Sequence, residues 1–257
     1  VSTTPSKYTL RATMCRSYVP PAQSTVRLPV SGNRSTGTGN ATKHLAQHLV
    51  LLLDVIHAKR WSALESIVLS NPQVFRMICD NIPMVEEFNG GKTLLHACLP
   101  YDPPLKTVAK IIKMLPDSTA ALRSQDSMGR TPLHIAAAYT TDPMVVKLLG
   151  SVDPETCTIT DEDGRTPLHL SCDSTFTIKD ESYKCQPQKP QQCETRSYEI
   201  VRALLSESLE ASLAEDEDGM NALEYAIISE ASIDVVNLLQ KASMESLQRQ
   251  EQIRSGK

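Results

Sequence analysis

Histidine and cysteine side chains in the middle of the chain raise the question of a metal site. His169, Cys172, Cys185 and Cys193 supply one imidazole and three thiols, a set that zinc accepts. Their irregular spacing does not match the short paired intervals of zinc modules. We therefore predict no metal and no cofactor. A metal-binding or redox module built on Cys185 and Cys193 remains an alternative to free thiols.

Three histidines, His96, His134 and His169, recur at intervals of 38 and 35 residues. Such intervals are typical of a repeat, and stacked helices lie about 10 Å apart. Histidines one repeat apart are then too distant to share a metal ion. We therefore expect a structural role for all three.

Two glycine-containing motifs invite a phosphate or a calcium site. Residues 90–93 (Gly-Gly-Lys-Thr) look like part of a phosphate loop, but Glu86 stands where that motif needs glycine. Residues 161–164 and 216–219 (both Asp-Glu-Asp-Gly) could open calcium loops. The twelfth positions of those loops, however, are Cys172 and Ile227 instead of glutamate. No nucleophile–histidine set or carboxylate pair stands out, so we predict that the chain is not an enzyme.

The elements that position these residues come from a repeated unit. Residues 131–134 (Thr-Pro-Leu-His) return as 166–169, with degraded copies at 93–96 (Thr-Leu-Leu-His) and 221–224 (Asn-Ala-Leu-Glu). Threonine suits a helix N-cap and proline suits the first helical position. Three copies follow an Asp-x-x-Gly turn, in which glycine tolerates a positive φ.

A second helix follows in each unit. Fourteen residues after Thr131, the run 145–149 (Val-Val-Lys-Leu-Leu) places apolar residues at i, i+3 and i+4, one stripe of a helix. Counterparts lie at 108–112, 200–205 and 235–239. Each unit is therefore predicted to contain a turn, a short helix, a connector and a second helix.

This pattern resembles the ankyrin repeat, whose signature is Thr-Pro-Leu-His-x-Ala. The resemblance is specific at 129–149 and at 164–170 with 200–205, good at 91–115 and weak at 219–239. It implies an all-α ankyrin-repeat solenoid of helix pairs with short β-turn or hairpin fingers. It also implies that the threonine and histidine of each signature tie neighbouring turns and helices together. The signature residues are Gly91, Thr93, His96, Gly129, Thr131, Pro132, His134, Gly164, Thr166, Pro167, His169 and Gly219.

The same pattern sets the expected domain boundaries. We predict a disordered, basic Ser/Thr-rich tail at 1–42, a divergent N-terminal helix pair with its connector at 43–90, and ankyrin repeats at 91–128, 129–163 and 164–218. A capping repeat with a polar tail follows at 219–257. The third repeat carries an inserted loop at 174–195, and the Ser-x-x-Glu sequence at 62–65 has the form of a capping box. Glu224 in place of histidine, and a polar outer face, suit a terminal repeat.

Charge and cysteine content limit the function classes. Positions 1–53 contain six basic residues and no acidic one, whereas the remainder has 20 basic and 30 acidic residues. An acidic stack argues against nucleic-acid binding by the repeats. No apolar run reaches the roughly 20 residues that span a bilayer. Seven cysteines without a secretory signal indicate a reducing compartment, which we take to be the cytoplasm. The nucleus, or an organelle reached by a transit sequence in the tail, is the alternative.

The family resemblance also implies where a partner binds. Its turns project as fingers, and these line a concave surface together with the first helices. We expect a protein–protein interaction module or scaffold, monomeric, with a basic peptide or surface as partner because acidic residues crowd the later fingers. The missing initiator methionine motivates the alternative of a regulatory fragment of a larger protein. The predicted contacts are Lys92, Tyr101, Ser127, Met128, Arg130, Tyr139, Glu162, Asp163, Arg165, Glu217, Asp218 and Met220.

Overall fold

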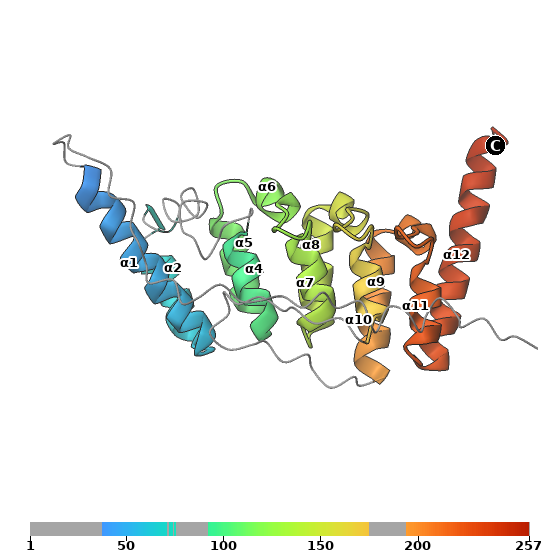
Figure 1. The fold of residues 1–257 in the computed structure, drawn as a ribbon, viewed down its shortest axis with the longest axis horizontal. Coiled ribbons are helices and arrows are strands. Elements are labelled where there is room, and N and C mark those ends of the chain that lie inside the picture. Colours follow the sequence, from blue (N-terminus) through green and yellow to red (C-terminus); the bar gives the residue numbers. More distant parts are fainter. Residues whose placement is uncertain (1–37, 71, 74, 76–91, 175–193, 257) are drawn as a thin grey trace, which may run out of the picture. The chain divides into compact units, whose positions relative to one another are not determined.

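The computed structural model describes residues 38–70, 72–73, 75, 92–174 and 194–256 (Figure 1). Most of the predicted tail, the connector at 81–90, Gly91, and the inserted segment with Cys185 and Cys193 lie outside the described residues. The helices of the described residues belong to one unit, Thr38–Lys257.

Two columns of helices run through this unit in sequence order (Figure 1). The first column contains the short helices that begin at the repeat signatures: α4 (Leu94–Cys98), α7 (Pro132–Tyr139), α9 (Pro167–Cys172) and α11 (Ala222–Ile228). The second column contains α5 (Leu105–Met114), α8 (Pro143–Val152), α10 (Glu194–Glu207) and α12 (Ile233–Arg254). Within each column every helix packs against the next. The predicted all-α ankyrin solenoid is confirmed.

Short elements that the sequence analysis did not predict connect the columns and the units. They are η5 (Leu99–Tyr101), α6 (Ser118–Arg123), η6 (Pro154–Cys157) and η7 (Glu210–Leu213). Across the described residues, the β-structure amounts to an isolated bridge between Glu215 and Asn221 in the last finger. The fingers are therefore turns with very little hairpin character.

The local sequence explains why the first helices start where they do. Thr131 and Thr166 are N-caps with extended backbone, and Pro132 and Pro167 occupy the first helical positions. All eight residues of α7 are buried, because α4 and α9 cover its two sides and α8 packs on it as well. The second helices bury only one stripe, which in α8 includes Val145, Val146 and Leu149. The core is therefore a thin aliphatic seam that continues from unit to unit.

The N-terminal pair, α1 (Thr38–His57) and α2 (Trp61–Ser70), differs from the prediction in two ways. α1 begins within the segment assigned to the tail, because that boundary was drawn near the first apolar residue of the periodic pattern and not at the first helical turn. α2 begins at Trp61, so Ser62 lies inside the helix and the predicted capping box is wrong. Glu65 reaches α5 instead, where it accepts a hydrogen bond from Thr107 (2.9 Å) and pairs with Lys110 (2.5 Å).

The last helix, α12, also departs from expectation. A polar outer face was predicted for the terminal repeat, but Ile233, Met244 and Leu247 are exposed on α12. None of the helices in the described part of the chain is both long enough and apolar enough to cross a bilayer.

Candidate functional site

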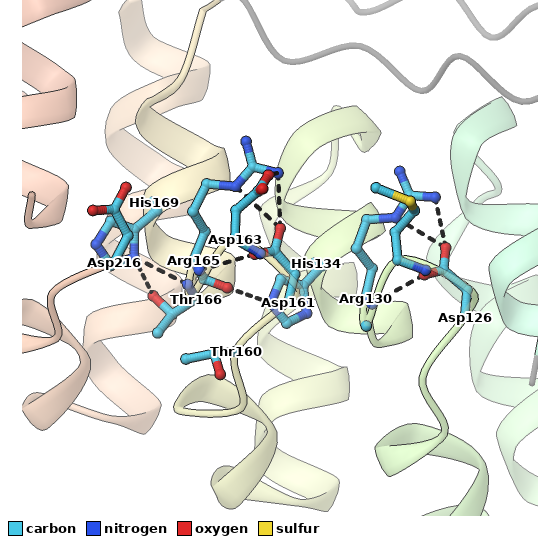
Figure 2. Close-up of polar contacts among 12 residues, drawn as sticks. Asp126, Arg130, His134, Thr160, Asp161, Asp163, Arg165, Thr166, His169 and Asp216 are labelled. Atoms are coloured by element: carbon cyan, nitrogen blue, oxygen red, sulfur yellow. Dashed lines mark hydrogen bonds and ion pairs between the residues drawn. The ribbon is translucent and has the colours of Figure 1, made fainter. Parts of the chain in front are cut away.

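Three fingers, at 126–130, 161–165 and 216–220, each place an aspartate in a turn, and Figure 2 shows the polar contacts of these aspartates. In the first, one carboxylate oxygen of Asp126 accepts hydrogen bonds from the N–H groups of Met128 (2.9 Å) and Arg130 (3.0 Å). The other oxygen accepts two bonds from the Arg130 guanidinium, at 2.9 and 2.7 Å. Burial raises the pKa of Asp126, but the Arg130 contacts outweigh it and hold that pKa below its usual value.

The second finger repeats this arrangement and the third varies it. Asp161 binds Arg165 in the same way, with guanidinium distances of 3.1 and 2.9 Å. The third finger has Met220 in place of the arginine, and the hydroxyl of Tyr225 donates to Asp216 instead (2.7 Å). Burial, followed by this hydrogen bond to Asp216, raises the pKa of Tyr225. Each turn aspartate is thus buried and satisfied within its own unit.

Histidines join each unit to the next. The ring Nε2 of His96 lies 2.8 Å from the carbonyl oxygen of Arg130, and those of His134 and His169 lie 3.0 and 3.1 Å from Arg165 and Met220. The other ring nitrogen, Nδ1, accepts the backbone N–H of the capping threonine, 3.0 Å away in each unit. The hydrogen must therefore be on Nε2, which donates to the neighbouring finger. Both ring nitrogens of each of these histidines are therefore used in hydrogen bonds that hold the structure together.

Burial keeps these rings neutral. It lowers the pKa of His96 and of His134 to about 4, and it lowers that of His169 in the same direction. A protonated ring would lose the Nδ1 acceptor that the threonine N–H requires.

Adjacent fingers also bind one another through the backbone. The N–H of Glu162 donates to Met128 (3.0 Å), and that of Glu217 donates to Asp163 (3.1 Å). Gly129 and Gly164 have φ of +72° and +77°, and a Cβ on either would lie 2.8 Å from the next finger's backbone nitrogen. Gly219 has a φ of +75° but no atom within 4 Å of such a Cβ. The first two fingers thus need glycine both for its positive φ and for the close approach of the next finger. The third finger needs it only for the positive φ.

The structure removes four predicted contacts from the accessible surface. Lys92, Tyr101, Arg130 and Tyr139 are buried. Arg130 is held by Asp126, and Tyr101 packs edge-on against His57 with ring centroids 5.3 Å apart. The sequence gives the finger register but not the depth at which a side chain lies, so the large polar types were wrongly taken for surface anchors.

The exposed part of the finger surface is mostly acidic. Ser127, Met128, Glu162, Glu217 and Asp218 are exposed. Three further predicted contacts are half-buried: Asp163, Arg165 and Met220. Asp163 and Arg165 pair with each other at 2.7 Å. Fewer acidic side chains of the later fingers reach the surface than the sequence suggested, because Asp161 and Asp216 point into their own turns.

Two structural sites were missed from the sequence. Asp102, in left-handed backbone with φ of 58°, accepts the N–H (2.7 Å) and the hydroxyl (2.6 Å) of Thr141 in the next unit. Asn221 caps α11, and the carboxylate of Glu224 accepts the Asn221 N–H at 2.8 Å. The second site had a signal, since Asn-x-x-Glu is a capping-box pattern. Glu224 thus replaces histidine as a cap but supplies no donor to a further finger.

Metal ligation finds no support among the residues that the structure places. No three His, Cys, Asp or Glu side chains of that part come together in a way that could hold an ion. Cys98, Cys157 and Cys172 are buried, and burial raises the pKa of Cys157 to about 12. Cys185 and Cys193 lie outside the described residues.

Comparisons with known proteins agree with this geometry. A family model for ankyrin repeats, in three copies, matches residues 105–179. Human NF-kappa-B inhibitor alpha is 32% identical over 84 residues, which is 32% of this chain and 25% of that protein. Human B-cell lymphoma 3 protein is 28% identical over 156 residues, 60% of this chain and 29% of that protein. The chain thus aligns with less than a third of each relative's length. On the repeat model, the two relatives and the repeated capping geometry together, this chain contains ankyrin repeats.

Proposed function

We propose that this chain is a protein-binding module that captures a basic segment of its partner along the fingers at 161–165 and 216–220. One observation carries the proposal: several acidic side chains of the finger turns are exposed, whereas the arginine side chains are buried or half-buried. Glu162, Glu217 and Asp218 extend into solvent. Arg130 is buried on Asp126, and Arg165 is half-buried on Asp161 and Asp163. A partner therefore meets negative charge from two neighbouring fingers.

The fixed spacing of the fingers gives this charge its selectivity. Backbone hydrogen bonds and the histidine contacts hold adjacent fingers in register. Exposed carboxylates contribute little energy singly, but complementary charge speeds association and rejects wrong partners. Met128, exposed beside Ser127, adds apolar contact area at one edge. The partner class that fits is an extended or helical segment with several lysines or arginines.

A charge-reversal experiment tests this surface. The triple variant Glu162→Lys, Glu217→Lys and Asp218→Lys should weaken binding of a fluorescent Lys/Arg-rich peptide at least tenfold at low salt, as measured by anisotropy. The control Glu210→Lys, Glu230→Lys and Glu251→Lys changes the net charge equally at exposed positions away from the two fingers. Equal losses in both variants would mean that only net charge matters, and they would refute the finger site.

The name of one relative supplies a partner to try. NF-kappa-B inhibitor alpha is similar to this chain over 84 residues, so an NF-kappa-B protein is our proposed natural partner. Biolayer interferometry with immobilised NF-kappa-B protein should show binding by the wild type and the control variant and loss of binding by the finger variant. Peptide capture without NF-kappa-B binding would discard this partner and keep the basic-segment site.

The proposed location is the cytoplasm or nucleus. The support is the set of buried thiols, Cys98, Cys157 and Cys172, which fit a reducing compartment.

A further inference from the structure

The last unit exposes positions that the earlier units bury. Ile227 is 56% exposed, whereas its equivalents Ala137 and Cys172 are 1% and 4% exposed. Leu223 and Val236 are half-buried, whereas Leu133 and Leu168 (equivalent to Leu223) and Val146 (equivalent to Val236) are buried. The last unit thus exposes apolar positions that the earlier units bury.

The outer side of α12 extends this surface. Val235, Leu239 and Ala242 face the stack and are buried. On the opposite side, Ile233, Met244 and Leu247 are 68%, 62% and 50% exposed. At 100° per residue these three fall within one 60° sector together with Gln240, and Val236 borders it. We call Ile233, Val236, Gln240, Met244 and Leu247 the end stripe. Contiguous exposed apolar surface marks protein interaction sites.

The spacing of the end stripe is the same in both chain directions. Its intervals are three, four, four and three residues, centred on Gln240. A second α12 running antiparallel would place Ile233 opposite Leu247, Val236 opposite Met244, and Gln240 opposite itself. Such a self-complementary pattern is what a two-fold interface requires.

Polar groups agree with the same arrangement. A glutamine amide has donors and an acceptor, so two Gln240 side chains on a two-fold axis can bond to each other reciprocally.

We propose that the end stripe is a self-association surface on which α12 pairs antiparallel with α12 of a second copy of this chain. The pairing covers the seam residues Leu223 and Ile227 at its margin. All stripe residues lie on α12, so the stripe shares no residue with the fingers at 161–165 and 216–220. The monomer expected from the sequence analysis is then the dissociated form.

Sedimentation velocity at protein concentrations from about 1 to about 200 µM tests whether the chain dimerises. The wild type should shift from monomer to dimer, and Met244→Glu with Leu247→Glu should weaken the association at least tenfold. Met144→Glu, at a 50% exposed position on α8, is the matched control and should associate like the wild type. If the wild type stays monomeric throughout, the proposal is overturned, and the stripe would have to bind another protein or another segment of the chain.

A pair of variants at the centre tests the register. Gln240→Glu and Gln240→Lys should each fail to dimerise alone, because like charges meet on the axis, while an equimolar mixture should form dimers at least tenfold more tightly than either variant. Circular dichroism and the urea midpoint of each variant should match the wild type, since residue 240 is exposed in the monomer. Wild-type dimerisation in both single variants, or no gain on mixing, would overturn the antiparallel pairing.

Discussion

The finger glycines separate two constraints that usually coincide. Gly129→Ala and Gly164→Ala impose left-handed strain and push a methyl group against the next finger's backbone. Gly219→Ala imposes the strain alone. We expect a loss of about 1–2 kcal/mol for Gly219→Ala from the φ strain, and a clearly larger loss for the other two. Urea unfolding of the three variants measures this. Equal losses would show that finger spacing adapts freely to an added methyl.

The buried histidines give stability a defined pH dependence. The imidazole of His96 titrates near its ordinary value of 6.5 when unfolded and near 4 when folded, because burial disfavours its charged form. Between these values the unfolded chain binds more protons, so stability is complete above about pH 6.5 and falls as the pH drops toward 4. His96→Gln, which cannot titrate, should cost about 1–2 kcal/mol at neutral pH and make the urea midpoint fall less steeply in this window, where His134 and His169 still titrate. An unchanged slope would contradict the linkage.

The third finger offers a rescue experiment. Tyr225→Phe removes the hydroxyl that donates to Asp216 and should cost about 1–2 kcal/mol, because a buried carboxylate oxygen loses its partner. Adding Met220→Arg recreates the aspartate–arginine pair of the other two fingers and should recover part of that loss. Thermal unfolding of the single and double variants measures both effects. If Met220→Arg stabilised the wild type equally, the recovery would not come from Asp216.

At the scale of the element, helix α7 depends on complete burial. Leu133 is fully covered, and Leu133→Asp would place a carboxylate in an aliphatic seam without a partner. We expect loss of cooperative unfolding and of most helical circular dichroism. Leu133→Met, similar in volume, is the control and should fold. A folded Leu133→Asp protein would show that the seam can admit water.

The helices also show what could be predicted from the sequence. The Thr-Pro-Leu-His copies fix the helix starts at Thr131 and Thr166, because N-cap and proline preferences are local. Periodicity cannot tell which face a neighbouring unit covers, so Tyr101 and Tyr139 were assigned to the surface and the end of α12 to a polar cap. Residues 62–65 match the capping-box pattern, yet α2 starts one residue before Ser62, at Trp61. Glu65 is instead used in tertiary contacts with Thr107 and Lys110.

For the whole molecule, units that contact only their neighbours should unfold separably when an end is weakened. Trp61, the chain's one tryptophan, packs at the α2 end, far along the array from α11. Leu223→Asp, at a half-buried position of the terminal unit, should unfold α11 and α12 at lower urea than the rest. Circular dichroism would then lose signal before Trp61 fluorescence changes. Coincident transitions would indicate one cooperative block.

The histidine contacts run one way along the chain, and this limits how such an array can be lengthened by gene duplication. Each signature histidine (His96, His134 and His169) donates to the turn that follows it, whereas Glu224 can only accept. A duplicated copy of residues 129–163 placed before Gly164 would inherit a donor on one side and an acceptor on the other. The same copy appended beyond Arg254 would follow Glu224, and no imidazole would donate a hydrogen bond to its finger. New units are therefore best accommodated in the interior of the array.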